Sequence, residues 1–181
     1  FIQELERVVP VELASTHLKS ATIALEELLG VVATDEILDQ VFRDFSHSEE
    51  AKGLIRRFGL REVDIVQSMV IFKNSHFGGE VAAHQDQTYL HSFPEPIKGV
   101  WIPLERSTKE NGCLWVLPYG KEPLLKEVFS RTNNIAKTTK VNNVDWPEKD
   151  FIPLELDVGE VLLFDGLLPH KSHCLLYTSP S

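Results

Sequence analysis

The spacing of apolar residues divides the chain into a helical first third and a strand-rich remainder. Apolar residues recur every three to four positions, the period of an amphipathic helix, in three stretches: 21–29, 37–45 and 51–58. Gly59 follows the last stretch, where glycine commonly ends a helix. Ser46 and Glu49 have the spacing of a capping box, which predicts that the last helix begins there.

The period changes near residue 64, where short runs rich in β-branched and aromatic residues begin. We predict strands within seven segments: 64–73, 81–90, 99–105, 113–117, 152–156, 160–164 and 167–172. The intervening stretch 119–150 is polar and irregular, and we expect it to be a long insertion with one short helix at 124–129.

Helices followed by many short strands predict an α+β fold. Strands of this length joined by turns are typical of a sandwich, a barrel or a jelly roll. We expect an N-terminal helical region (1–63), a β core with its insertion (64–172) and an atypical tail (173–181). Neither end reads as the end of a complete protein, so we expect a chain shortened at both ends.

Composition narrows the possible functions. The net charge is −9 and no basic run occurs, which argues against nucleic acid as a partner. No apolar run approaches about 18 residues, so we expect no membrane span. The two cysteines lack a CxxC spacing and fit a reducing compartment, which favours an intracellular, cytoplasmic location, with the peroxisome as an alternative.

The clearest chemical feature is His84-Gln85-Asp86. On a strand, residues i and i+2 share a face, so His84 and Asp86 point the same way. His170, in the last predicted strand, is the best third ligand. Two His and one carboxylate leave three positions open on Fe(II), although zinc accepts the same ligand types. A zinc hydrolase and a non-catalytic jelly roll that binds a metal or small ligand are therefore alternatives.

Five segments together resemble the phytanoyl-CoA dioxygenase family: 66–73, 76–81, 84–86, 99–102 and 110–115. The resemblance implies a double-stranded β-helix, a cupin-like jelly roll on which the N-terminal helices pack. It also implies an oxidoreductase that uses Fe(II), 2-oxoglutarate and O₂ to hydroxylate a small organic or acyl-type substrate. The expected iron ligands and catalytic residues are His84, Asp86 and His170.

The resemblance also implies co-substrate contacts from Met69, Gln85, Trp101 and Ser172. One departure concerns an Arg that the family carries about ten residues after its distal His, because no Arg follows His170 here. An Arg fork binds the far carboxylate of 2-oxoglutarate with two parallel hydrogen bonds. We therefore expect an incomplete C-terminal strand and little turnover by the 181-residue chain, even if it binds iron.

Overall fold

The computed structural model describes residues 43–57, 59–69, 71, 73, 79–119 and 123–173. Its elements, in chain order, are α3 (Glu49–Arg57), β1 (Val81–His84), the 3₁₀ helix η1 (Asp86–Thr88), β2 (Lys98–Trp101), β3 (Leu114–Val116), β4 (Glu127–Thr132), β5 (Ile135–Lys140), the 3₁₀ helix η2 (Glu148–Asp150), β6 (Ile152–Leu154), β7 (Leu162–Asp165) and β8 (His170–Ser172). The helix predicted over 21–29, most of the one over 37–45 and the tail beyond 173 lie outside the described residues.

Helix α3 confirms the last predicted helix, but it begins later than the capping box suggested. The Ala51 N–H donates to the Ser48 hydroxyl at 3.1 Å, so Ser48 caps the helix. Ser46 is still helical in the preceding turn, and its hydroxyl lies 3.1 Å from that of Ser68. The predicted cap at Ser46 is therefore wrong, because the chain turns at 47–48 before the new helix starts.

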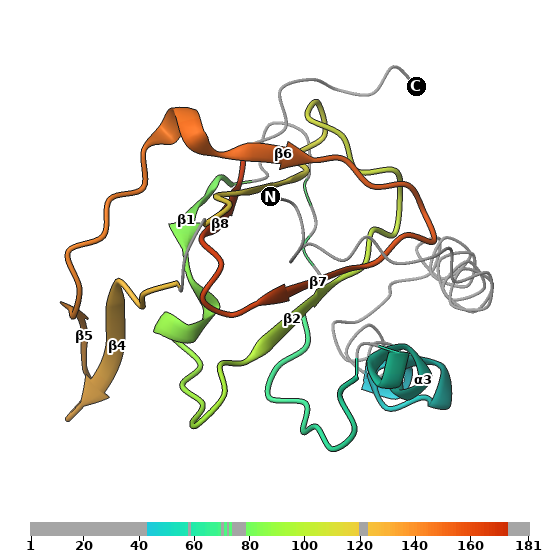
Figure 1. Cartoon of the computed structure of the whole chain (residues 1–181), viewed down its shortest axis with the longest axis horizontal. Coiled ribbons are helices and arrows are strands. Elements are labelled where there is room, and N and C mark those ends of the chain that lie inside the picture. Colours follow the sequence, from blue (N-terminus) through green and yellow to red (C-terminus); the bar gives the residue numbers. More distant parts are fainter. Residues whose placement is uncertain are drawn as a thin grey trace.

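Antiparallel strands form three sheets in the described part of the chain (Figure 1). One sheet has four strands in the order β1-β8-β3-β6, and the other two are the pairs β2-β7 and β4-β5. Strand β8 is hydrogen-bonded on both sides, to β1 and to β3. The fold is thus mixed α+β, as predicted; its sheets are antiparallel, and the described strands do not close into a barrel.

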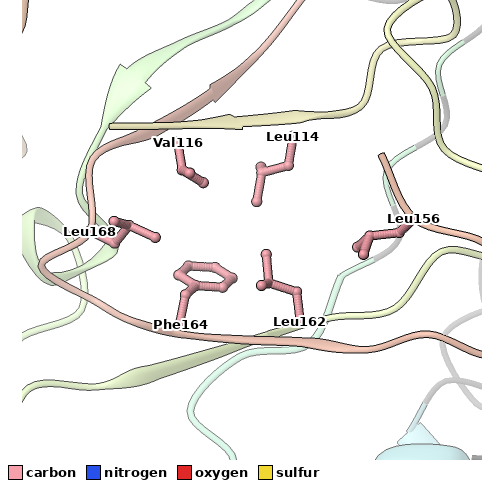
Figure 2. Close-up of a cluster of buried hydrophobic side chains, with 6 residues drawn as sticks. All are labelled: Leu114, Val116, Leu156, Leu162, Phe164 and Leu168. Carbon is pink, nitrogen blue, oxygen red and sulfur yellow. The ribbon is translucent and has the colours of Figure 1, made fainter. Parts of the chain in front are cut away.

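A small apolar core lies between the four-stranded sheet and β2-β7 (Figure 2). Leu114 and Val116 of β3 point toward Leu162 and Phe164 of β7, and all four are buried. Val116 pairs with His170 across the β3–β8 ladder, and Leu114 pairs with Ser172. Because directly paired residues of antiparallel strands share a face, His170 and Ser172 are directed to the core side of the sheet.

Two strand predictions are wrong or too long. The described residues between 63 and 73 form no strand, and Val66 and Met69 are 70% and 63% exposed. β-Branched composition favours a strand only where neighbouring strands and a buried face are available, and no described strand pairs with this segment. The strand predicted over 81–90 ends at His84, because the chain enters η1 two residues later.

The predicted helix at 124–129 is also wrong. Its residues lead into β4, which pairs with β5 as a hairpin. Asn133 and Asn134 form the connection with positive φ angles of 50° and 63°, which Asn adopts more readily than most residues. The expected insertion thus carries regular strands. The division of the chain at residues 63 and 172 stays a prediction.

Candidate metal centre

The three residues predicted to bind a metal lie together. His84 ends β1, Asp86 begins η1, and His170 begins β8, opposite His84 in the β1–β8 register. Both imidazole Nε2 atoms lie 3.5 Å from Asp86 Oδ1, and the three ligand atoms are all within 4.8 Å of one another. Strand parity had required Asp86 to lie on the same strand as His84, but β1 ends at His84. The carboxylate of Asp86 reaches the histidines from the η1 turn instead.

Backbone carbonyls set the orientation of both imidazoles. His84 Nδ1 lies 2.9 Å from the Ala82 carbonyl, and His170 Nδ1 lies 3.0 Å from the Leu168 carbonyl. A carbonyl oxygen only accepts hydrogen bonds, so each Nδ1 carries the proton and donates it. In its neutral form each imidazole therefore presents the Nε2 lone pair to the centre, which is the arrangement usual for histidines that bind metals.

The spacing of the donor atoms fits one metal ion. Two ligands about 2.1 Å from a metal at angles of about 90–110° are roughly 3.0–3.4 Å apart. The two 3.5 Å separations at Asp86 are close to this range. The His170 side chain is only 8% exposed, against 21% for His84 and 27% for Asp86. Solvent therefore reaches the centre from the side of His84 and Asp86.

The pKa values of the three groups follow from their burial and mutual contacts. Burial raises the pKa of Asp86, but the His84 hydrogen bond and both imidazoles outweigh it, so its pKa is lowered overall. Burial lowers the pKa of His84, but the Asp86 hydrogen bond and the Ala82 carbonyl reverse the shift and raise it. Burial and the nearby His84 lower the pKa of His170. The shifts at Asp86 and His170 favour the ionised carboxylate and the neutral imidazole that a divalent cation requires, whereas the raised pKa of His84 favours a proton that the cation would have to displace.

Two aromatic rings lie edge-on to the imidazoles. The Phe164 ring centroid is 5.0 Å from that of His170, on the core side. The Tyr89 centroid is 6.1 Å from that of His84, on the more exposed side, and Tyr89 itself is 49% exposed. Sequence reasoning did not identify either residue, although Tyr89 follows the His84-Gln85-Asp86 triplet by only three positions.

Residues predicted to contact the co-substrate occupy different environments. Trp101 packs against the core, and its indole Nε1 is buried with no hydrogen-bond partner among the described residues. Ser172 is 3% exposed and shares the face of His170. Met69 is largely exposed in an irregular segment. The Gln85 amide binds backbone groups of Leu124, Lys126 and Leu167. The co-substrate contacts of all four stay predictions.

A cavity of about 520 Å³ lies beside the expected insertion. Its lining includes Tyr119, Trp146 and Gln85, but none of the three candidate metal ligands. Gln85 thus borders this cavity while its two sequence neighbours form the metal centre. None of the helices in the described part of the chain is long and apolar enough to cross a membrane.

Comparison with known sequences identifies the family. The sequence model of phytanoyl-CoA dioxygenase (PhyH) matches residues 4–174. The chain is 38% identical over 138 residues to phytanoyl-CoA dioxygenase domain-containing protein 1 of Mus musculus, covering 74% of this chain and 47% of that protein. It is 36% identical over 135 residues to a phytanoyl-CoA dioxygenase of Arabidopsis thaliana, covering 75% and 47% respectively. The chain therefore spans about half the length of these relatives.

Solved structures show a similar fold at low sequence identity. AviO1 from Streptomyces viridochromogenes Tue57 gives a TM-score of 0.56 at 16% identity, covering 97% of this chain and 83% of that one. The epimerase SnoN, in complex with Fe³⁺, alpha-ketoglutarate and nogalamycin RO, gives 0.57 at 12% identity, covering 98% and 76%. These structures agree with the fold but do not assign a reaction. On the match across residues 4–174, the chain belongs to the phytanoyl-CoA dioxygenase family.

Proposed function

We propose that this chain carries the metal and co-substrate site of an Fe(II)- and 2-oxoglutarate-dependent dioxygenase that hydroxylates a small organic or acyl-type substrate. The observation that carries the proposal is the convergence of His84, Asp86 and His170 on one point. Two imidazoles and one carboxylate on one side of Fe(II) leave positions for a chelating 2-oxo acid and O₂. The family and the iron and alpha-ketoglutarate in the SnoN structure support the same chemistry.

The strand order supports a jelly roll, the double-stranded β-helix expected from the resemblance. Strands β1, β3, β6 and β8 form one sheet, and β2 and β7 form a pair that faces it across the apolar core, so the chain passes between these two sheets at β1–β2–β3 and again at β6–β7–β8. The metal ligands come from the start of β8 and the end of β1, which are adjacent strands. A paired β1–β8 ladder therefore provides the rigid support that a metal site needs.

The residues of the chain would bind and orient, while bound Fe(II) supplies the redox chemistry with O₂. Asp86 would offset one of the two positive charges of the ion, and the Nε2 atoms of His84 and His170 would hold it together with this carboxylate. The Trp101 Nε1 is a buried donor without a partner among the described residues, and such a group needs an acceptor, which a carboxylate of 2-oxoglutarate would provide. The Ser172 hydroxyl, on the same face as His170, is a second group that can bind the co-substrate.

Succinate release distinguishes this proposal from a zinc hydrolase and from a non-catalytic metal-binding jelly roll. The chain would be loaded anaerobically with Fe(II) or Zn(II), then exposed to O₂ at saturating 2-oxoglutarate. We expect succinate formation with Fe(II) only, and none in Asp86→Ala. Bound Fe(II) without any succinate would favour the non-catalytic module, and ester hydrolysis with Zn(II) alone would favour the hydrolase.

A further inference from the structure

One buried side chain connects the metal centre to the β4–β5 hairpin. Gln85 lies between His84 and Asp86 in the sequence and is only 1% exposed. Its Nε2 donates to the Leu124 carbonyl at 3.0 Å and to the Leu167 carbonyl at 2.6 Å. Its Oε1 accepts from the Lys126 N–H at 2.8 Å. Both donors of the amide are thus used, and its oxygen is paired, which fixes the side chain in one orientation.

The partners of Gln85 lie at two places that matter for the site. Leu124 and Lys126 lie at the base of the hairpin. There the Val141 N–H donates to the Lys126 carbonyl at 2.9 Å and joins the two ends of the hairpin. Leu167 directly precedes Leu168, whose carbonyl orients His170. A single amide therefore joins the hairpin base to both segments that carry the metal ligands.

The hairpin extends from this base to the exposed side of the metal centre. The Phe129 ring of β4 lies against Tyr89, with centroids 5.6 Å apart, and Tyr89 in turn lies edge-on to His84. In Figure 1 the hairpin stands beside the green helical turn that follows β1, which is η1, and β4 and β5 form a sheet separate from the two core sheets. Tyr89 and Phe129 thus form an aromatic wall next to the more exposed metal ligands.

We infer that Gln85 is a positioning residue that holds the hairpin against the metal centre, so that the aromatic wall receives an apolar part of the substrate. This inference rests on the proposed function and names the residues that select the substrate. An apolar group resting on two aromatic rings leaves contact with water, which favours binding in proportion to the area covered. The wall would thereby direct C–H groups of the substrate, rather than charged groups, toward the His84–Asp86 side.

The first test measures hydrogen exchange at the hairpin. In Gln85→Leu, all three bonds are lost and three backbone groups lose their partner. We expect exchange of the 126 and 141 amides to rise at least about tenfold, while exchange in β2 and β7 is unchanged. Gln87→Leu is the matched control, because Gln87 is also buried but binds the 92–97 loop instead. Unchanged hairpin exchange in Gln85→Leu, or equal acceleration in β2 and β7, would overturn the positioning role.

Gln85→Glu guards against a Leu variant that does not fold. Glu keeps an oxygen that can accept from the Lys126 N–H but cannot donate to the Leu124 and Leu167 carbonyls. We expect an intermediate rise in hairpin exchange and a clear loss of Mn(II) affinity, because the Leu167 segment orients His170. Mn(II) affinity equal to that of the unaltered chain would contradict the proposed link to the metal centre.

The second test examines the wall without any turnover. Mn(II), bound at the metal centre, broadens the proton resonances of a small apolar probe, cyclohexanol, that binds nearby. We expect Phe129→Ala to reduce this broadening several-fold at unchanged Mn(II) affinity. Ile135→Ala is the control, since Ile135 is an exposed apolar residue of the same hairpin at 69% exposure. Equal broadening in both variants would overturn the wall alone, whereas failure of Mn(II) to bind would overturn the proposed function as well.

Discussion

A methyl group at Gly99 should disturb both the core and the metal centre. Gly99 of β2 pairs directly with Phe164 of β7, and the Phe164 ring lies over the glycine. A Cβ at position 99 would lie 2.3 Å from Phe164 Cζ and 2.5 Å from Cε2. Ordinary carbon contacts are about 3.5–4.0 Å, so the ring would have to move by more than about 1 Å.

The expected cost of Gly99→Ala is about 1–3 kcal/mol of unfolding free energy, the range typical of overpacked cores. The displaced ring also contacts His170, so we expect weaker Mn(II) binding together with the lower stability. Urea denaturation measures the first effect and metal titration the second. Gly53→Ala is the matched control, because nothing lies within 4 Å of a Cβ there and the site is inside α3. That substitution should stabilise the protein by about 0.5–1 kcal/mol.

A second substitution separates the steric explanation from a general weakness of β2. Phe164→Leu alone should destabilise the core, but in the Gly99→Ala background it should remove the clash. The two changes should therefore be less harmful together than their sum, with a coupling of about 0.5–3 kcal/mol. Additive effects, or a Gly99→Ala variant as stable as the unaltered chain, would refute the reasoning.

Three further predictions concern ionisable groups. Metal binding requires neutral His84, and the pKa of His84 is raised. The Mn(II) affinity measured by calorimetry should therefore fall as the pH decreases, approaching about tenfold per pH unit below that pKa. An affinity that does not change with pH would contradict this. Cys113 is fully buried and its pKa is raised to about 11. In a Cys174→Ser variant, iodoacetamide should therefore label Cys113 only as fast as the protein unfolds. Rapid labelling of the folded protein would contradict the burial of Cys113. The hydrogen bond and charge of buried Lys171 lower the pKa of Glu148 below its usual 4.5. The stability that the Lys171–Glu148 pair contributes should be present above pH 4.5 and should be lost as the pH falls through the lowered pKa of Glu148. The destabilisation caused by Glu148→Gln, measured by urea denaturation, should therefore shrink in acid. A destabilisation that is the same at every pH would contradict the contribution of this pair.

Local sequence patterns predicted the parts of the fold that depend on local chemistry. The His84-Gln85-Asp86 triplet pointed to a metal site, and His170 was found because it lies on a short apolar strand. The segments that became β2, β3, β6, β7 and β8 were also recognised, with longer bounds than the strands have. Short apolar runs joined by turns marked these segments.

The errors arose where tertiary contacts decide the outcome. The 64–73 segment has strand-like composition, but no described strand pairs with it. The helix predicted at 124–129 gave way to a hairpin because Asn133 and Asn134 tolerate the positive φ of a two-residue turn. The contact between Tyr89 and Phe129 joins residues forty positions apart, and no local pattern indicates such a pair.

Locating the iron directly would test the central claim. Crystals of the chain grown without oxygen and soaked with Fe(II) would be measured at the iron absorption edge. We predict one anomalous peak about 2.0–2.2 Å from His84 Nε2, His170 Nε2 and an Asp86 carboxylate oxygen. The peak should vanish in Asp86→Ala. Iron bound elsewhere while these three residues hold no metal, or a peak that persists unchanged in Asp86→Ala, would contradict the account.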